Sequence, residues 1–212
     1  MFTGFVRLLV FAVALVGAKV SFAAGDAQAG QQKAAMCLGC HGVDGNSLVP
    51  NFPKLAGLGE KYLLKQMQDI RDGRRPVALM AGQVDNMTDQ DLSDIAAFYN
   101  SQARSGSQTD PEKLALGRKV YLAGIAERQV PACAACHSPT GNGNGPAGYP
   151  ALGGQHAEYT AAQLKMFRKG YEDAAGRTNG GEAKIMRTTA FRMSDMEIDA
   201  VASYIAGLQP SP

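Results

Sequence analysis

The residues with the clearest chemical meaning are four cysteines and two histidines, arranged as Cys-x-x-Cys-His at 37–41 and again at 133–137. The two motifs use every cysteine of the chain and two of its three histidines. On one helical turn, the two thiols can each add to a vinyl group of the same porphyrin, and the next residue can bind its iron. The sequence therefore predicts two covalently bound haem c groups (iron). The attachment residues are Cys37, Cys40, Cys133 and Cys136, and the proximal iron ligands are His41 and His137.

Structural disulfides, a four-cysteine zinc site and thioredoxin-like redox pairs are the other interpretations of paired cysteines. Disulfides and zinc give no reason for a histidine directly after each pair. A thioredoxin motif needs a βαβ context, which the chain lacks. Haem attachment is the interpretation that uses all the residues of both motifs.

The sixth iron ligand is expected to be a methionine, because a low-spin electron carrier closes its iron with a second strong ligand, usually a Met thioether or another His. Met80 and Met186 each lie eight residues before a predicted helix cap, Thr88 and Ser194. They fall in segments without helical pattern, where a loop can fold over the far face of a haem. The sequence favours Met80 and Met186 as axial ligands.

Four further methionines and the third histidine are expected to have structural roles instead. Met87 and Met193 directly precede the two caps, where an apolar residue is expected to pack as a hydrophobic staple. Met67 and Met166 lie within predicted helices and are expected to pack there. His156 has no counterpart in the first half and is expected to form a hydrogen bond rather than bind iron.

The two proximal histidines are also expected to have hydrogen-bond partners, because a metal-bound imidazole normally donates its other N–H group. Pro53 follows His41, and Pro150 follows His137, at nearly the same distance, each after an aromatic residue. We predict that the carbonyl groups of Pro53 and Pro150 accept these bonds. The alternative is that the prolines only shape a turn.

The N-terminus has the pattern of a signal peptide over residues 1–23, with Arg7, an apolar run at 8–17 and small residues at 21–23. We expect a mature chain that begins at Ala24 and resides in the periplasm. Cleavage removes two of the 21 basic residues and none of the 19 acidic ones, so the mature polypeptide is formally neutral. No charge excess supports binding to nucleic acid.

The chain contains an internal repeat. Pro53-Lys54-Leu55-Ala56-Gly57 recurs as Pro150-Ala151-Leu152-Gly153-Gly154, about 97 residues later. We therefore expect two haem domains, at 24–104 and 111–212, joined by a linker at 105–110 within the polar stretch 101–111. Each half is small for an apolar core of its own, so we expect the chain without haem to be poorly folded.

The apolar spacing indicates an all-α protein. Helices are predicted at 30–40, 60–72 and after Thr88 in the first half, and at 111–123, 158–169 and after Ser194 in the second. Both last helices begin with a hydroxyl followed three residues later by an acid, but only Ser194 with Glu197 is a full capping-box match. A further loop, at 124–131, is expected before the second haem motif.

The order of these motifs resembles the di-haem cytochrome c4 family. The resemblance covers the mature chain through Asn-Phe-Pro-Lys-Leu-Ala-Gly, Tyr-Leu-Leu-Lys-Gln-Met and Leu-Gly-Gly-Gln-His-Ala, and through the closing helices. It implies two tandem class I cytochrome c domains about a pseudo-twofold axis, with His41 and Met80 on one iron and His137 and Met186 on the other. The chain departs from the family in a Gly-rich, charged run at 172–184, just before Met186.

The resemblance also implies a periplasmic electron carrier, often loosely associated with the membrane. Such a carrier passes electrons from the cytochrome bc complex towards a terminal oxidase, commonly of the cbb3 type. The alternatives are the electron-accepting subunit of a periplasmic dehydrogenase and a di-haem peroxidase. A peroxidase needs an iron with an open or releasable sixth position and nearby acid–base groups. A methionine candidate in both halves, with no distal histidine in register with either, argues against it. We expect a protein that is not itself an enzyme.

Basic residues cluster in the first half of the chain, and they could face an acidic partner protein. We interpret them instead as a solvated surface that also helps to neutralise haem propionates. The cluster consists of Lys54, Lys61, Lys65, Arg71, Arg74 and Arg75.

Overall fold

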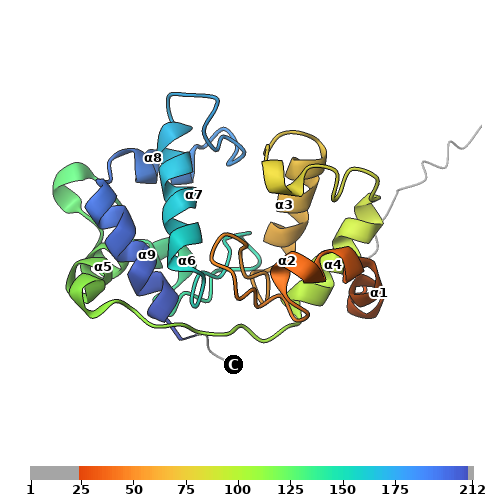
Figure 1. The fold of residues 1–212 in the computed structure, drawn as a ribbon. Helices are drawn as coiled ribbons and strands as arrows, with labels where there is room; N and C mark the ends of the chain where they lie inside the picture. The colour runs from red at the N-terminus through yellow and green to blue at the C-terminus, as the bar shows by residue number, and fades with distance from the viewer. Residues whose placement is uncertain (1–23, 210–212) are drawn as a thin grey trace, which may run out of the picture.

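The computed structural model describes residues 24–209, so the predicted signal peptide lies outside the described residues. Within that range the chain is helical, and its only β pairing is two isolated bridges. Figure 1 shows two lobes of helices with the loops gathered between them, and an extended segment running along one side from lobe to lobe. The prediction of an all-α protein is confirmed. No helix in this range is long and apolar enough to cross a membrane.

The first lobe is built from three α-helices of regular length and three short pieces. Their bounds are α1 Ala27–Lys33, η1 Ala34–Met36, α2 Leu38–His41, α3 Glu60–Arg71, η2 Ala78–Met80 and α4 Asp89–Asn100. The helix predicted at 30–40 is therefore wrong as a single element. A 3₁₀ turn interrupts it, and the amide of Cys37 bonds to the carbonyl of Ala34. This tighter turn keeps Ala34 fully buried in the core and separates the first haem motif from α1.

The second lobe repeats this order with longer helices. Its elements are α5 Pro111–Ala123, η3 Ala126–Arg128, α6 Ala134–His137, α7 Ala157–Lys169, α8 Ile185–Phe191 and α9 Asp195–Gly207. The expected loop at 124–131 contains η3 and a bridge between Ile125 and Val130. Helix α5 matches its predicted bounds because Asp110 caps it and Pro111 occupies the first helical position.

Both last helices begin with a complete capping box, including the one at Thr88 that was not expected to be a full match. The shorter Asp91 carboxylate still reaches the Thr88 amide, at 3.0 Å. In α9, Ser194 and Glu197 make the same pair of bonds. Lys33 and Thr88 also bond to Asp91, and together they lower the pKa of this carboxyl to about 2.

The internal repeat is present in the hydrogen bonds as well as in the sequence. The amide of Gly57 bonds to the carbonyl of Tyr99 on α4, and the amide of Gly154 bonds to Ile205 on α9. Each proline-containing segment thus attaches to the last helix of its own half. This attachment holds in place the Pro53 and Pro150 carbonyl groups, one in each proline-containing segment.

Two separate apolar cores support the two lobes. The first is formed by seven buried residues: Ala34, Leu58, Leu63, Ile95, Ala96, Phe98 and Tyr99. The second has ten: Val120, Tyr121, Val130, Leu164, Phe167, Ala190, Met193, Ile198, Val201 and Ile205. Among the described residues, no residue belongs to both cores. Each half is therefore organised around its own helices.

Polar contacts hold the two halves together at the loops. Gln155 receives a hydrogen bond from the Lys54 amide at 2.9 Å and donates one to the Lys54 carbonyl at 2.8 Å. The amide of Ala151 bonds to the carbonyl of Leu58 across the same boundary. At the start of the connecting segment, Arg104 donates to the carbonyl of Gly141 in the second lobe, and the Ser105 amide donates to Asn46 in the first. The connection is therefore packed against both lobes.

Candidate functional site

The two Cys-x-x-Cys-His motifs form single helical turns with the same geometry. The His41 amide bonds to the Cys37 carbonyl at 3.0 Å, and the His137 amide bonds to the Cys133 carbonyl at 2.9 Å. The four cysteines form no disulfide with one another, and all six motif residues line one cavity between the lobes. Burial raises the pKa of the Cys37 thiol and raises that of Cys133 to about 11. Each turn therefore presents two thiols and an imidazole to the same space.

The proximal histidines have the hydrogen-bond partners predicted from the sequence. Nδ1–H of His41 donates to the Pro53 carbonyl, and Nδ1–H of His137 donates to the Pro150 carbonyl, both at 2.9 Å. Burial lowers the pKa of both imidazoles, so the neutral form is favoured. With the proton fixed on Nδ1, the lone pair is on Nε2, the nitrogen that can bind a metal.

The cavity has a volume of about 740 Å³ and is lined by residues of both halves. Its walls are largely apolar. They include Leu55 and Leu152, which occupy equivalent positions in the two halves, and also Leu63. Paired thiols, a neutral imidazole and apolar walls in each half fit a covalently attached porphyrin. Bound there, each haem supplies an iron that exchanges one electron. The protein residues hold it by thioether formation, orient the imidazole and exclude water.

Met80 and Met186 both line this cavity, as required of an axial ligand. Met80 ends η2, and Met186 is the second residue of α8. Their expected location in irregular segments is therefore wrong, since each lies in a short helix. In α8 this helix follows Lys184, which has left-handed backbone dihedrals and turns the chain into it.

The other methionines divide into two groups. Met87 and Met193 pack against the apolar cores and do not line the cavity, which confirms them as packing residues. Met67 and Met166 do line it, from α3 and α7, and so does the exposed Met36 beside the first motif. Cavity lining alone thus leaves five methionines among the described residues, and the repeat position distinguishes Met80 and Met186.

His156 forms a hydrogen bond, as the sequence analysis expected. It precedes α7, and its Nε2–H donates to the Ser47 carbonyl of the other half at 2.9 Å. It does not line the cavity. Its role in the structure is a contact between the halves.

The basic cluster of the first half is not uniformly a solvated surface. Lys54 is only 8 % exposed and donates to the Ser105 carbonyl. Arg75 is partly buried and lines the cavity, together with Arg177 of the second half. Lys61, Lys65 and Arg74 are exposed as expected, and Arg71 forms ion pairs with Asp72 and Asp89.

Sequence reasoning missed the polar groups that surround these two arginines. Tyr62 and Gln66 on α3, and Tyr159 and Gln163 on α7, are repeat equivalents that line the cavity. Their shared 97-residue spacing was a signal that could have identified them. When the same polar side chains recur on the buried face of two equivalent helices, they are expected to share a hydrogen-bonding role. Arg177 gave no such signal, since it lies in the run at 172–184 that breaks the repeat.

A sequence profile described as cytochrome c matches the chain twice, at residues 27–103 and 114–209. Cytochrome c4 of Pseudomonas aeruginosa is 52 % identical over 200 residues, which cover 94 % of this chain and 96 % of that protein. The crystal structure of reduced recombinant cytochrome c4 from Pseudomonas stutzeri superimposes with a TM-score of 0.84 at 51 % identity. The match covers 88 % of this chain and 100 % of that one.

A protein described as a thiosulfate dehydrogenase electron acceptor, from Thiomonas intermedia, is 34 % identical over 207 residues, covering 96 % of this chain and 92 % of that protein. These likenesses extend over both halves, including both haem motifs. Two cytochrome c domains, two c-type haems and a role in electron transfer rather than catalysis follow from them. The chain therefore belongs to the cytochrome c4 family.

Proposed function

We propose that this chain carries single electrons in the periplasm, from the cytochrome bc complex or another donor to a terminal oxidase of the cbb3 or another type. The observation that carries the proposal is the pair of equivalent sites on one cavity, each with two thiols, an oriented imidazole and a methionine at the repeat position. A site closed on both faces of the iron keeps its ligands during electron exchange. It therefore favours transfer over substrate binding.

We further propose His41 with Met80, and His137 with Met186, as the axial pairs, and Cys37, Cys40, Cys133 and Cys136 as the attachment residues. The proposed domains are 24–104 and 111–212, with a linker at 105–110 and a signal peptide at 1–23. The two profile matches at 27–103 and 114–209 support this division. The signal pattern supports export, and peripheral association with the membrane is part of the proposal.

A second candidate has a specific observation in its favour. The Thiomonas relative is described as the electron acceptor of a thiosulfate dehydrogenase, and its likeness to this chain extends along nearly the whole length. This chain would then take electrons from a periplasmic dehydrogenase and still deliver them to an oxidase. The two candidates differ in the donor and share the acceptor.

Stopped-flow kinetics with the purified, haem-loaded protein test both candidates. The oxidised protein is mixed with reduced cytochrome bc complex, or with thiosulfate dehydrogenase and thiosulfate, and the reduced protein is mixed with a cbb3-type oxidase. We expect rapid reduction by the bc complex and rapid oxidation by the oxidase. Fast reduction by the dehydrogenase alone would select the second candidate. Slow oxidation by the oxidase would contradict both.

A further inference from the structure

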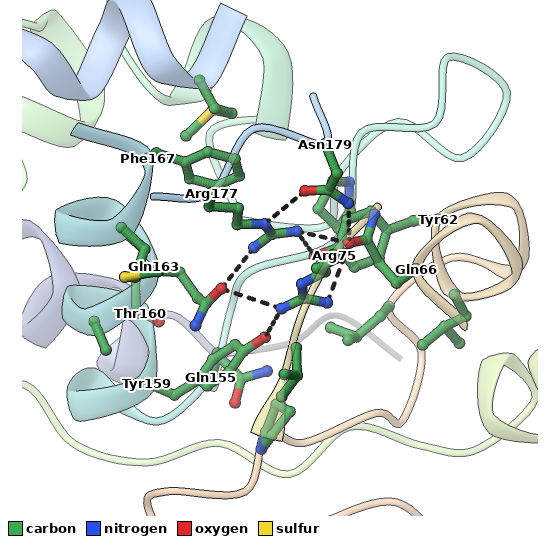
Figure 2. A pocket seen from close by; sticks show the side chains of 18 of the residues that line it. Tyr62, Gln66, Arg75, Gln155, Tyr159, Thr160, Gln163, Phe167, Arg177 and Asn179 are labelled. Carbon is green, nitrogen blue, oxygen red and sulfur yellow. Dashed lines mark hydrogen bonds between the residues drawn. The ribbon is translucent and has the colours of Figure 1, made fainter. Parts of the chain in front are cut away.

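Two arginines from opposite halves meet in the cavity between the lobes. Arg75 follows α3 in the first half, and Arg177 follows α7 in the second. Figure 2 shows both guanidinium groups between Gln66 on one side and Gln163 on the other. Arg177 is 7 % exposed, and its guanidinium carbon lies 4.3 Å from the centre of the Phe167 ring. The two cations therefore occupy the boundary between the haem sites.

Their hydrogen bonds cross between the halves in a repeated pattern. Arg75 donates from one terminal nitrogen to Gln66 of its own half. Its other terminal nitrogen donates to Tyr159 and Gln163 of the opposite half, both at 3.1 Å.

Arg177 makes the same set of contacts in the reverse direction. One terminal nitrogen donates to Gln163 of its own half, at 2.8 Å. The other donates to Gln66 of the opposite half, at 2.7 Å, and to Tyr62, at 3.3 Å. Because Tyr62 and Tyr159, and Gln66 and Gln163, are repeat equivalents, each arginine contacts both halves in the same way. We call these six residues the crossed arginine cluster.

No carboxylate in the described part of the chain pairs directly with the two guanidinium groups of this cluster. The side-chain acceptors of the two arginines are neutral amides and phenols, and no carboxylate in residues 24–209 forms an ion pair with either. The nearby Asp69 attracts Arg75 through space, but its direct ion pairs are with Lys65 and Arg74. Among cavity-lining residues, four are basic, and the acidic one, Glu158, is exposed.

The Tyr62 hydroxyl responds to this imbalance. Burial opposes its ionisation, but the positive charges of Arg177 and Arg75 outweigh burial and lower the pKa of Tyr62. Buried cations are stable in proteins only when an anion or a full set of hydrogen bonds compensates them. The free energy of two adjacent buried guanidinium groups is thus lowered most by an anion in the same cavity.

We propose that the crossed arginine cluster binds carboxylate groups of both haems, so that each arginine sets the reduction potential of the haem in the opposite half as well as its own. The inference rests on the two haems of this family and not on the proposed donor, acceptor or methionine ligands. Arg75 and Arg177 are positioning residues here, because they act on the iron through the charge near the macrocycle. A positive charge there disfavours the oxidised, more positive iron and raises the potential.

The test is a redox titration of haem-loaded Arg177→Gln, with the two haems followed separately through their haem methyl resonances. We expect both potentials to fall relative to the unsubstituted protein, and Arg75→Gln to lower both as well. Arg168→Gln is the matched control, since Arg168 is in the second half, pairs with Asp195 and does not line the cavity. Arg177→Lys keeps the charge and is expected to leave both potentials near their original values.

A fall confined to the haem of the second half in Arg177→Gln, or a shift no larger than that of Arg168→Gln, would overturn the proposal. Should Arg177→Gln fail to load haem, Arg75→Gln tests the same coupling from the other half. A free anion such as phosphate is the other source of negative charge. Potentials of the unsubstituted protein that change as phosphate replaces chloride at constant ionic strength would assign the cluster to that anion and contradict binding of haem carboxylates.

Discussion

At the scale of single residues, a methionine bound to each iron would determine how strongly that site holds an electron. A thioether ligand stabilises ferrous iron, and axial ligation sets haem potentials over a range of about 0.8 V. Five of the methionines that the structure describes line the cavity, so the assignment of Met80 and Met186 is a choice among neighbours. Substitution can separate the ligands from the methionines that only fill space.

We predict that Met80→Ala and Met186→Ala each remove about half of the weak sulfur-to-iron charge-transfer absorption, because one of two irons loses its sulfur ligand. The potential of that haem is expected to fall, and carbon monoxide to bind there. Absorption spectra of the oxidised and reduced proteins measure this. Met67→Ala and Met166→Ala are the matched controls, as both residues line the cavity from helices.

Either control losing half of the band, with Met80→Ala or Met186→Ala unchanged, would transfer the ligand role to the helix methionines. The hydrogen-bond partners of the two motif histidines were more predictable. The motif specifies His41 and His137 by adjacency, and the repeat identified the carbonyls of Pro53 and Pro150. The short helix that carries Met186 was not predictable, because the Gly-rich run before it has no periodic pattern.

At the scale of the elements, each half depends on a close crossing between its first and last long helices. Gly30 of α1 faces the Asp94 carbonyl of α4, and Gly117 of α5 faces the Ala200 carbonyl of α9. A Cβ atom built on these glycines would lie 1.9 Å and 2.3 Å from those oxygens. The two contacts are equivalent, although the first helices of the halves have little sequence in common.

We predict that Gly117→Ala lowers the free energy of unfolding by about 1–3 kcal/mol, the usual cost of overpacking, despite the higher helix propensity of alanine. Denaturant titration of the haem-loaded protein measures it. Gly145→Ala is the control, because nothing lies within 4 Å of a Cβ at that loop position and its φ is not positive. A Gly117→Ala protein within roughly 0.5 kcal/mol of the original would mean that the helices separate easily.

The sequence predicted most helices but not this crossing. The caps Asp110, Thr88 and Ser194 mark helix starts by accepting hydrogen bonds from nearby backbone amides. Such contacts between neighbouring residues can be predicted from a sequence. From sequence alone, a glycine inside a helix indicates only a weak helix former. Its role in a close crossing is visible only when the backbone of the neighbouring helix is known. The interruption of the first helix by η1 was missed for the same reason, since burial of Ala34 depends on packing from α3 and α4.

At the scale of the whole molecule, two lobes with separate cores are joined by hydrogen bonds between their loops and by the crossed arginine cluster. The reciprocal pair between Gln155 and Lys54 fixes the loops, and the cluster fixes the cavity side. The repeat predicted two domains but not how they face each other, because contacts across the boundary join residues far apart in sequence. Haems attached to the two motifs would fill the cavity beside both cores and so complete both lobes.

The two lobes are expected to depend on haem to different degrees. The core of the first half has seven buried residues, two of them alanines, whereas that of the second has ten. Burial of apolar surface stabilises by about 25 cal/mol per Å². Without haem, the first half therefore retains less burial to offset the conformational entropy of its chain.

We predict that a Cys37→Ser, Cys40→Ser protein, which cannot attach the first haem covalently, loses hydrogen-exchange protection throughout α3 and α4. The Cys133→Ser, Cys136→Ser protein is the matched counterpart and is expected to keep partial protection where α5 packs against α9, through Val120 and Val201. Hydrogen exchange read by mass spectrometry, with haem content measured per chain, compares them. Equal loss in the two halves would show that the interface, and not the size of each core, determines the stability of the lobes.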